Sequence, residues 1–510
     1  MPTEASWTER NPHLRAVTDV GHLVRFRAAA VRRRSTFRWG AGLLLVVTVA
    51  VAVVPAYVPG AGGSGKAFDV LLLLPTALAA FLAVGVVSAA ASGGGRELLD
   101  RDASSVHPIS PTTDHLGALL LAPLNIAWLL QTWTLLGGTA YALGNEVTLM
   151  SAQVVLLLWI ATATATSQAV AWGLEGARRV PHGVVGIRAL VVALLGAALG
   201  LQISGHLLSL FDRFPTKEVV VGMVIGFNER WLLTVLALAG LLLAAVVVGA
   251  MPAHLAAHRI PRDELRVEAG TFAARRPPFS DLTALIRTDR GSVWRAVSMR
   301  RGLAVLAVGP GLVALLGDLP WGSMTILPGL VASGGALLFG VNAWCLDGRG
   351  ALWRESLPVL PGTVFTARAY VLAEFLLAAS LATVALAAVR AGVPDVSEMV
   401  ALVCTLVVVT VQVVAAALRW SAQHPFAVDL RSARATPAPP LSMVAYSTRL
   451  AISTTLTGVV FSVLSGLDEW RISVLIAVPF VCWSSARLAR TYRLWLTPVE
   501  RARIITTVAV

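Results

Sequence analysis

Long apolar runs follow one another along this chain almost without pause. Each run is close to the roughly 20 residues that a helix needs to cross a bilayer. Of the 510 residues, 56% are hydrophobic and only 14% are charged, whereas a soluble globular chain carries about 25% charged residues. These runs exclude an ordinary soluble fold, and we expect an all-α, polytopic helical membrane protein.

Windows of about 18 to 28 residues predict roughly twelve transmembrane helices. Those of the first half lie near 39–58, 68–91, 115–142, 147–173, 189–210 and 231–250. Those of the second half lie near 303–319, 325–346, 367–389, 398–418, 446–466 and 472–489. The window 303–319 has the weakest pattern, because Gly309, Pro310 and Gly311 interrupt it.

The basic residues predict how these helices are oriented, because Lys and Arg are enriched in cytoplasmic loops. Of the 41 Lys and Arg residues, 35 fall in the two terminal segments and in the loops on the same side. The loops on the opposite side hold only Lys66, Arg213, Lys217, Arg230, Arg390 and Arg471. We therefore expect both termini in the cytoplasm and a multi-pass protein of the cell membrane. The net charge of +13 belongs to these flanks, so we expect no nucleic-acid partner.

The longest polar stretch divides the chain into two halves. It is rich in proline and arginine, a composition that suits a cytoplasmic linker. The predicted domains are an N-terminal cytoplasmic or interfacial segment 1–38, a first six-span unit 39–250, a basic cytoplasmic linker with an interfacial helix 251–302, a second six-span unit 303–489 and a cytoplasmic tail 490–510.

Two short motifs recur at the same places in both halves. The first, Thr-Asp-x-Gly-x-apolar-apolar-Arg, precedes the first span of each half and comprises Thr18, Asp19, Gly21 and Arg25, and then Thr288, Asp289, Gly291 and Arg295. The second follows the second span of each half and comprises Arg101, Asp102, Pro108 and Pro111, and then Arg354, Glu355, Pro358 and Pro361. Because each half has an even number of predicted spans, we expect two parallel six-helix repeats, related by an axis along the membrane normal.

The repeated segments have two interpretations each. Apolar residues at Val17, Val20, Leu23 and Val24 are spaced for a helix lying in the membrane interface, or the segment is a plain basic flank that fixes topology. The loops 92–113 and 347–366 carry paired opposite charges and end in Pro-x-x-Pro. Proline restricts its own φ and disfavours helix in the residue before it, so each loop is either a stiff cytoplasmic surface or a tight turn between spans.

One run of the first half resembles a known family. The stretch Gly95 to Asp102, Gly-Arg-Glu-Leu-Leu-Asp-Arg-Asp, is followed from Pro108 by Pro-Ile-Ser-Pro-Thr-Thr-Asp-His-Leu-Gly-Ala-Leu-Leu-Leu-Ala-Pro-Leu-Asn-Ile-Ala, up to Trp128. This run of about 35 residues resembles membrane subunits of actinobacterial ABC transporters of the exporter type. The resemblance implies interfacial helices near 14–34 and 285–301.

The same resemblance implies that the loops 92–113 and 347–366 are coupling loops that dock into separate ATPase subunits, with two ATPase copies. ATP and magnesium would then bind the partner and not this chain. The second half departs from the family pattern. Members often carry a short hairpin between the fifth and sixth spans, and 211–230 can form it, but the second half offers only 465–471 there.

Sequence motifs for enzymatic chemistry are weak or absent. Residues 60–66 fit the first positions of a phosphate-binding loop, but Ala67 replaces the Ser or Thr that would reach magnesium. Cys345, Cys404 and Cys482 all fall in apolar runs, which excludes a disulfide framework and a multi-cysteine zinc site. We expect no catalytic residues, no metal and no cofactor on this chain.

Three polar residues inside predicted spans are candidates for a substrate pathway: Asn125, Gln131 and Glu374. An ionisable group at the depth of Glu374 is expensive and is a functional candidate by default. Residues 346–350, Leu-Asp-Gly-Arg-Gly, also loosely resemble a loop of twelve-span secondary transporters. An ion-coupled secondary transporter is therefore the alternative hypothesis, and a membrane scaffold or assembly factor is the third.

Overall fold

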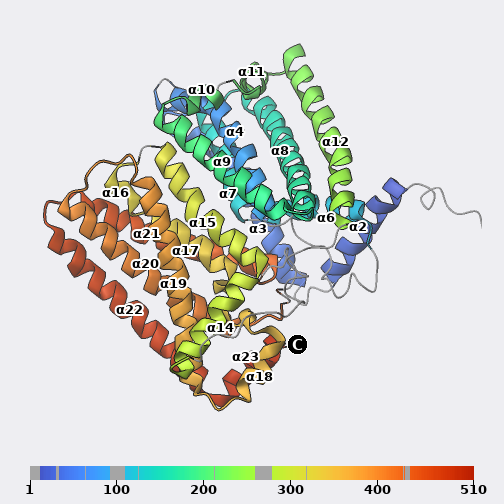
Figure 1. Cartoon of the computed structure of the whole chain (residues 1–510). Helices are drawn as coiled ribbons and strands as arrows, with labels where there is room; N and C mark the ends of the chain where they lie inside the picture. Colours follow the sequence, from blue (N-terminus) through green and yellow to red (C-terminus); the bar gives the residue numbers. More distant parts are fainter. Residues whose placement is uncertain are drawn as a thin grey trace, which may run out of the picture. The chain divides into compact units, whose positions relative to one another are not determined.

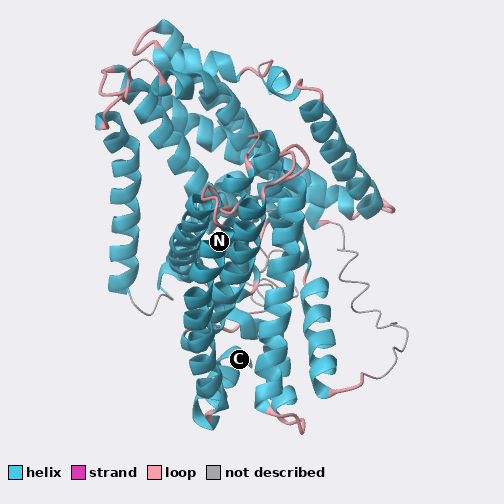
Figure 2. Cartoon of the chain, turned by 90° about the vertical axis from the view of Figure 1, so that its left-hand side faces the viewer, coloured by secondary structure: helices cyan, strands magenta, loops and turns pink. Residues whose placement is uncertain are grey.

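The structure, a computed structural model, describes residues 12–29, 34–63, 65–91, 109–124, 126–211, 213–258, 278–317, 319–428, 430 and 437–509. Helices account for all regular secondary structure in these ranges, which contain no strand (Figure 2). The chain forms two compact units, Met1–Arg262 and Asp263–Val510, which are described separately below. Four predicted site residues, Arg101, Asp102, Pro108 and Asn125, lie outside the described residues.

Among the described residues, eight helices are long and apolar enough to cross a membrane. They are Lys66–Ala90, Thr148–Arg178, Glu229–Ala257, Ser298–Leu315, Pro361–Ala387, Val396–Gln423, Ser442–Ser465 and Trp470–Leu496. A ninth span results if the bent pair Trp321–Gly335 and Gly340–Leu346 is one crossing. The chain is thus a helical, multi-pass membrane protein by length and composition of its helices, while twelve spans in two repeats stay a prediction.

Besides the bent span 325–346, three of the predicted spans are shortened or divided. The window 39–58 contains an apolar helix of only Ala41–Tyr57, and the apolar helix Gly183–Ala198 covers only the first part of the window 189–210. The window 115–142 is divided, because one helix ends at Leu121 and the next begins at Ile126. Pro123, which cannot donate a backbone hydrogen bond, lies between them.

The helices of the first unit are α2 (Pro12–Ala29), α3 (Arg34–Val53), η1 (Val54–Tyr57), α4 (Lys66–Ala91), α6 (Pro111–Leu121), η2 (Ala122–Leu124), α7 (Ile126–Leu143), α8 (Thr148–Arg178), α9 (Gly183–Ile203), α10 (Leu207–Phe211), α11 (Thr216–Val224) and α12 (Glu229–Ala257). Helix α8 is central and packs against α4, α7, α11 and α12 (Figure 1). Its buried residues include Val155, Leu156 and Ile160, which pack on Leu78 of α4 and Leu238 of α12.

Polar side chains of α8 reach the backbone of its neighbours. The Gln153 amide donates to the carbonyls of Ala52 and Leu136, at 3.0 and 3.2 Å. Near the end of α8, Arg178 donates to the carbonyl of Ala90 at 3.2 Å, and Arg179 donates to that of Ala256. Because a buried carbonyl without a partner costs free energy, these bonds fix α8 against α3, α4, α7 and α12.

The helices of the second unit are α14 (Asp281–Arg295), α15 (Val297–Leu316), α16 (Trp321–Met324), α17 (Leu327–Leu338), η3 (Gly340–Leu346), η4 (Gly348–Gly350), α18 (Ala351–Glu355), α19 (Pro361–Ala387), α20 (Val396–Gln423), α21 (Pro440–Ser465), α22 (Trp470–Leu496) and α23 (Pro498–Ala509). Helix α19 packs against α14, α15, α17 and α20, and α20 packs against α21 and α22 (Figure 1).

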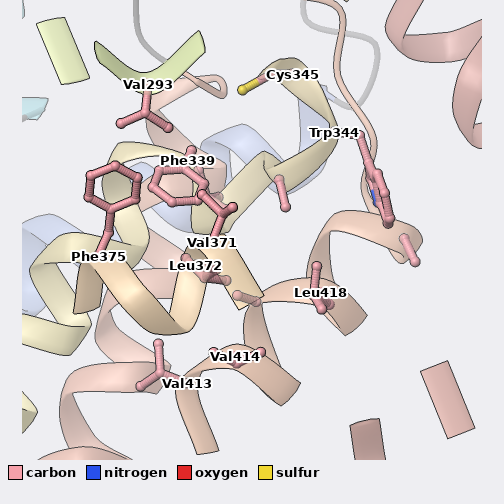
Figure 3. Close-up of a cluster of buried hydrophobic side chains, with 14 of the residues drawn as sticks. Val293, Phe339, Trp344, Cys345, Val371, Leu372, Phe375, Val413, Val414 and Leu418 are labelled. Atoms are coloured by element: carbon pink, nitrogen blue, oxygen red, sulfur yellow. The ribbon is translucent and has the colours of Figure 1, made fainter. Parts of the chain in front are cut away.

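The core of the second unit joins its membrane helices to the segments at one end of them. Val293 of α14, Phe339, and Leu372 and Phe375 of α19 lie in one buried cluster (Figure 3). The same cluster takes in Ile504, Ile505 and Val508 of α23. The segment that the sequence marks as a tail is therefore helical and part of the core.

Short sequence signals begin several of these helices. Pro111 and Pro361 are the first residues of α6 and α19, where the missing N–H of proline costs nothing. The Ser280 hydroxyl accepts from the N–H of Thr283, whose side chain bonds back to Ser280, and this capping box begins α14. The last proline of each Pro-x-x-Pro motif is thus the first residue of a helix.

Candidate functional site: a buried ion network beside the second loop

The site begins where the span 325–346 breaks. The helical segments before and after the break, Trp321–Gly335 and Gly340–Leu346, are bent by 45°, and Asn342 has the non-helical angles φ −148° and ψ 74°. The Asn342 side chain donates to the carbonyls of Phe426 and Pro437, at 2.8 and 3.0 Å. The Ser421 hydroxyl donates to the Gly340 carbonyl and accepts from the Ala343 N–H, at 3.0 and 2.8 Å. Ser421 thus satisfies two backbone groups at the break, and Asn342 ties the break to the backbone of Phe426 and Pro437.

Four charged side chains meet beside this break. Arg368, seven residues into α19, is fully buried. Its guanidinium donates to both carboxylate oxygens of Asp289 in α14, at 2.9 and 3.1 Å. It also donates to both oxygens of Asp347, each at 2.9 Å, and to the Ala343 carbonyl. Arg354 of α18 forms a further salt bridge with Asp347. Two arginines and two aspartates make the network electrically neutral.

The side chains of the network are almost closed to solvent. The side chains of Asp289, Asp347 and Arg354 are 6%, 11% and 11% exposed. Burial raises the pKa of Asp289 above its ordinary value, and the positive charge of Arg368 opposes that rise. Burial lowers the pKa of Arg354, against the attraction of Asp347. Charges taken out of water need partners of this kind, and removal of one partner leaves the others uncompensated.

Aromatic rings connect the network to the C-terminal helix. The Trp344 ring lies against the Arg368 guanidinium, 5.6 Å from its carbon, and stacks on Trp495 with ring centroids 3.9 Å apart. The Trp495 indole N–H donates to the Pro361 carbonyl at 2.8 Å, at the start of α19. Arg501 of α23 donates to Glu355 of α18 at 2.6 Å. Helix α23 is thereby fastened to the end of the loop.

The outer surface of the same loop is apolar and exposed. Trp353 is 80% exposed and Leu360 is 74% exposed. Leu352 and Leu357 are also exposed. The loop therefore has a charged inner side that is held by the protein and an apolar outer side that is largely exposed.

The predicted residues of the second half lie partly in this network. Asp289, Arg354 and Glu355 take part in it or in its tie to α23. Thr288 and Arg295 of the same motif are exposed on α14, and Gly291 is half-buried there. Pro358 lies in the loop between α18 and α19, and Pro361 begins α19.

The predicted residues of the first half form no comparable network in the described ranges. Thr18, Asp19, Gly21 and Arg25 lie on α2, and Pro111 begins α6. Asp19, which corresponds to Asp289, makes no ion pair with any described residue.

The two described pathway candidates differ in their surroundings. Gln131 is half-buried in α7. Glu374 is 37% exposed and pairs with Arg290 of α14, which donates to it at 2.8 Å. The hydrogen bond to Glu374 raises the pKa of Arg290. Glu374 therefore supplies a second ion pair between α14 and α19, next to the buried network.

Sequence reasoning missed Arg368, the group that joins the network. A signal was present, since Arg368 is an ionisable residue just inside the predicted span 367–389. Asp347 was noticed only as part of a loop motif. No local sequence pattern predicts the contacts of Trp495 and Arg501, because their partners are more than a hundred residues away in the chain.

Among the described residues, no group of His, Cys, Asp and Glu is arranged to hold a metal ion. No family model matches the chain, and no curated protein and no solved structure matches it.

Proposed function

We propose that this chain is the membrane-spanning permease subunit of an ABC-type exporter in the cell membrane. In this proposal it forms the substrate pathway with two parallel six-span units and has no ATPase site of its own. Two separate ATPase subunits, which bind ATP and magnesium, dock on the loops 92–113 and 347–366. Their closure rocks the spans and releases the substrate outside.

One observation carries the proposal: buried ion pairs hold the inner side of the loop 347–366, while its outer side is exposed. The network ties α18 to Asp347, and through Arg368 to α14 and α19. Force applied to the loop is thus passed to a membrane-spanning helix and to the helix before the seventh span. The exposed Trp353 and Leu360 offer a partner an apolar contact, the kind of residue that anchors protein interfaces.

The two halves differ at the position that holds this loop. Arg368 lies seven residues after Pro361, and the residue seven after Pro111 is Ala118, which is buried in α6. The first half therefore lacks the guanidinium that fixes the second loop.

The test is to purify the full chain from its native membranes in a mild detergent through a C-terminal tag. The proposal expects an ATP-binding protein in stoichiometric amount. It also expects the loss of that protein from the variant Trp353→Ala, with the exposed Val393→Ala at the other end of α19 as the matched control.

A preparation of the chain alone that moves a solute into liposomes under an ion gradient, without ATP, would overturn the proposal. That result would favour the ion-coupled transporter, for which Glu374 in α19 is the titratable candidate. A chain that holds several other membrane proteins and transports nothing would favour a scaffold.

A further inference from the structure

Two histidine side chains lie between α12 and α6, the helix that follows the first loop. Helix α6 begins at Pro111, near the end of the loop 92–113, and packs against α12 (Figure 1). The Thr112 hydroxyl and the ring Nε2 of His254 in α12 form a hydrogen bond of 2.9 Å. His115, one turn further along α6, is fully buried. Both contacts fall in the first two turns of α6, so they position the helix where it leaves the loop.

The His115 ring fills a notch that Gly249 leaves on α12. A Cβ atom at position 249 would lie 2.8 Å from both Cε1 and Nε2 of the ring, and 3.1 Å from the Cβ of Ala169 in α8. Carbon atoms in contact are normally about 3.5–4.0 Å apart, so glycine is the residue that fits beside this ring. The imidazole is thus enclosed where α6, α8 and α12 meet.

This enclosure suits a neutral imidazole better than an imidazolium cation. Neither ring nitrogen of His115 has a hydrogen-bond partner of normal geometry, and the carbonyl of Val246 in α12 is an acceptor near the ring. A neutral ring has one N–H to satisfy, whereas the cation has two and carries a charge. A buried charge without a partner is costly. Uptake of a proton by His115 therefore weakens the contact between α6 and α12.

No carboxylate among the described residues pairs with His115. Asp114 favours a charged His115, but adjacent residues on a helix do not face each other. In α8, Glu175 is already paired with Arg178 and Arg179, at 3.3 and 3.7 Å. The remaining described ionisable side chains of α2 and of this end of α12 are exposed or half-buried: Arg15, Asp19, His22, Arg25, His254 and His258.

We propose that His115 is a pH-sensitive contact, whose neutral ring holds α6 against α12 and whose protonated ring releases it. The bond between Thr112 and His254 withstands acid, because a hydroxyl can accept as well as donate. Helix α6 thus stays tied at its first turn while its second turn separates from α12. The consequence that acid shifts the first loop on its ATPase subunit rests on the proposed function, whereas the separation itself does not.

Thiol labelling measures the separation directly. Ala118, one turn after His115 on the same face of α6, is 2% exposed, whereas Leu120 is 54% exposed. The variant Ala118→Cys is made in the full-length chain with its three native cysteines changed to alanine. Its rate of reaction with N-ethylmaleimide is divided by that of Leu120→Cys in the same background. This division corrects for the effect of pH on the thiol itself.

The corrected rate should rise about tenfold between about pH 7.5 and pH 5.5. The separated state takes up a proton at the ordinary histidine pKa of about 6.5, and the closed state does not, so the closed state is lost as the pH falls. In His115→Leu the corrected rate should not change with pH, because leucine cannot be charged. The matched control His206→Leu removes an exposed histidine between α9 and α10 and should keep the tenfold rise.

Two outcomes would overturn the proposal. If the corrected rate is flat while His115 is present, the contact does not respond to acid, and this measurement needs no variant at His115 to fold. If the rise persists in His115→Leu, another group causes it. The labelling needs no ATPase subunit, so an ATP-binding protein that co-purifies while the rate stays flat would support the exporter and reject the pH-sensitive contact.

Discussion

Arg368 of α19 and Asp289 of α14 form a bidentate ion pair, with N to O distances of 2.9 and 3.1 Å, at a place almost closed to solvent. The pair joins a membrane-spanning helix to the helix that precedes the seventh predicted span. Through Asp347 the same guanidinium also holds α18 and the loop before α19. The second loop is therefore positioned by charge as well as by packing.

Loss of the central guanidinium should be costly. Arg368→Gln takes the guanidinium away from Asp289 and from the Ala343 carbonyl, and leaves Asp347 with Arg354 as its remaining partner. We expect the variant to lose about 3–5 kcal/mol of unfolding free energy, because a buried ion pair that is broken on one side is strongly destabilising. Chemical unfolding of the detergent-solubilised protein, followed by its helical circular-dichroism signal, measures this loss of unfolding free energy. Arg390→Gln is the control, and equal stability of the two variants would mean that the network is dispensable.

The pH dependence of the unfolding free energy should reflect the ionisation of Asp289. Burial raises the pKa of Asp289, so the folded state takes up this proton at a higher pH than the unfolded state does. The stability that Asp289 contributes is then fully present below the ordinary Asp pKa and is lost as pH rises through the folded value. The stability of the unmodified protein relative to Asp289→Asn should therefore fall as the pH rises. If the relative stability of the unmodified protein rises with pH instead, the positive charge of Arg368 outweighs burial and lowers the pKa of Asp289.

Charge reversals at Glu355 and Arg501 can distinguish two roles of Glu355, which are anchoring of α23 and contact with a partner protein. Each reversal alone, Glu355→Arg or Arg501→Glu, should cost about 1 kcal/mol or less, because Glu355 is 39% exposed and solvent screens the pair. The double reversal should restore stability. If the loop also contacts an ATPase subunit through Glu355, the double variant will remain impaired in co-purification. Full recovery of both properties would limit Glu355 to an intramolecular role.

Glu374 should be a structural partner of Arg290 and not the proton carrier of the protein. Glu374→Gln keeps a hydrogen-bond acceptor for Arg290, and both side chains are more than a third exposed. We expect a stability change of about 0–1 kcal/mol and unchanged ATP-dependent function. Measured transport that vanishes in Glu374→Gln, while the chain stays folded, would contradict this expectation and support ion coupling.

Much of the fold follows from local patterns. The apolar runs predicted the long helices, since a helix is the structure that satisfies its own backbone in lipid. The helices expected near 115 and 367 begin a few residues earlier, at Pro111 and Pro361. Pro123 marks the place where the window 115–142 is divided, but Pro310 lies inside the continuous helix α15, so a proline alone did not predict which windows break.

The site was predictable only in part. Asp289 and Arg354 were found through the repeated motifs, but a motif does not show which charges become neighbours. Arg368 and Asp347 are 21 residues apart, and Asp289 is 79 residues from Arg368. Their meeting depends on the break at Asn342 and on the packing of α14 against α19, which no short pattern encodes.

The most direct test of the central claim is a photo-crosslink from the second loop in native membranes. A photoreactive amino acid replaces Trp353, which is 80% exposed on α18, or Val393, which is 94% exposed beyond the other end of α19. The account predicts an adduct between position 353 and an ATP-binding protein, with none from position 393. Absence of any ATP-binding protein from the adducts of position 353, with the variant folded and in the membrane, would contradict the account.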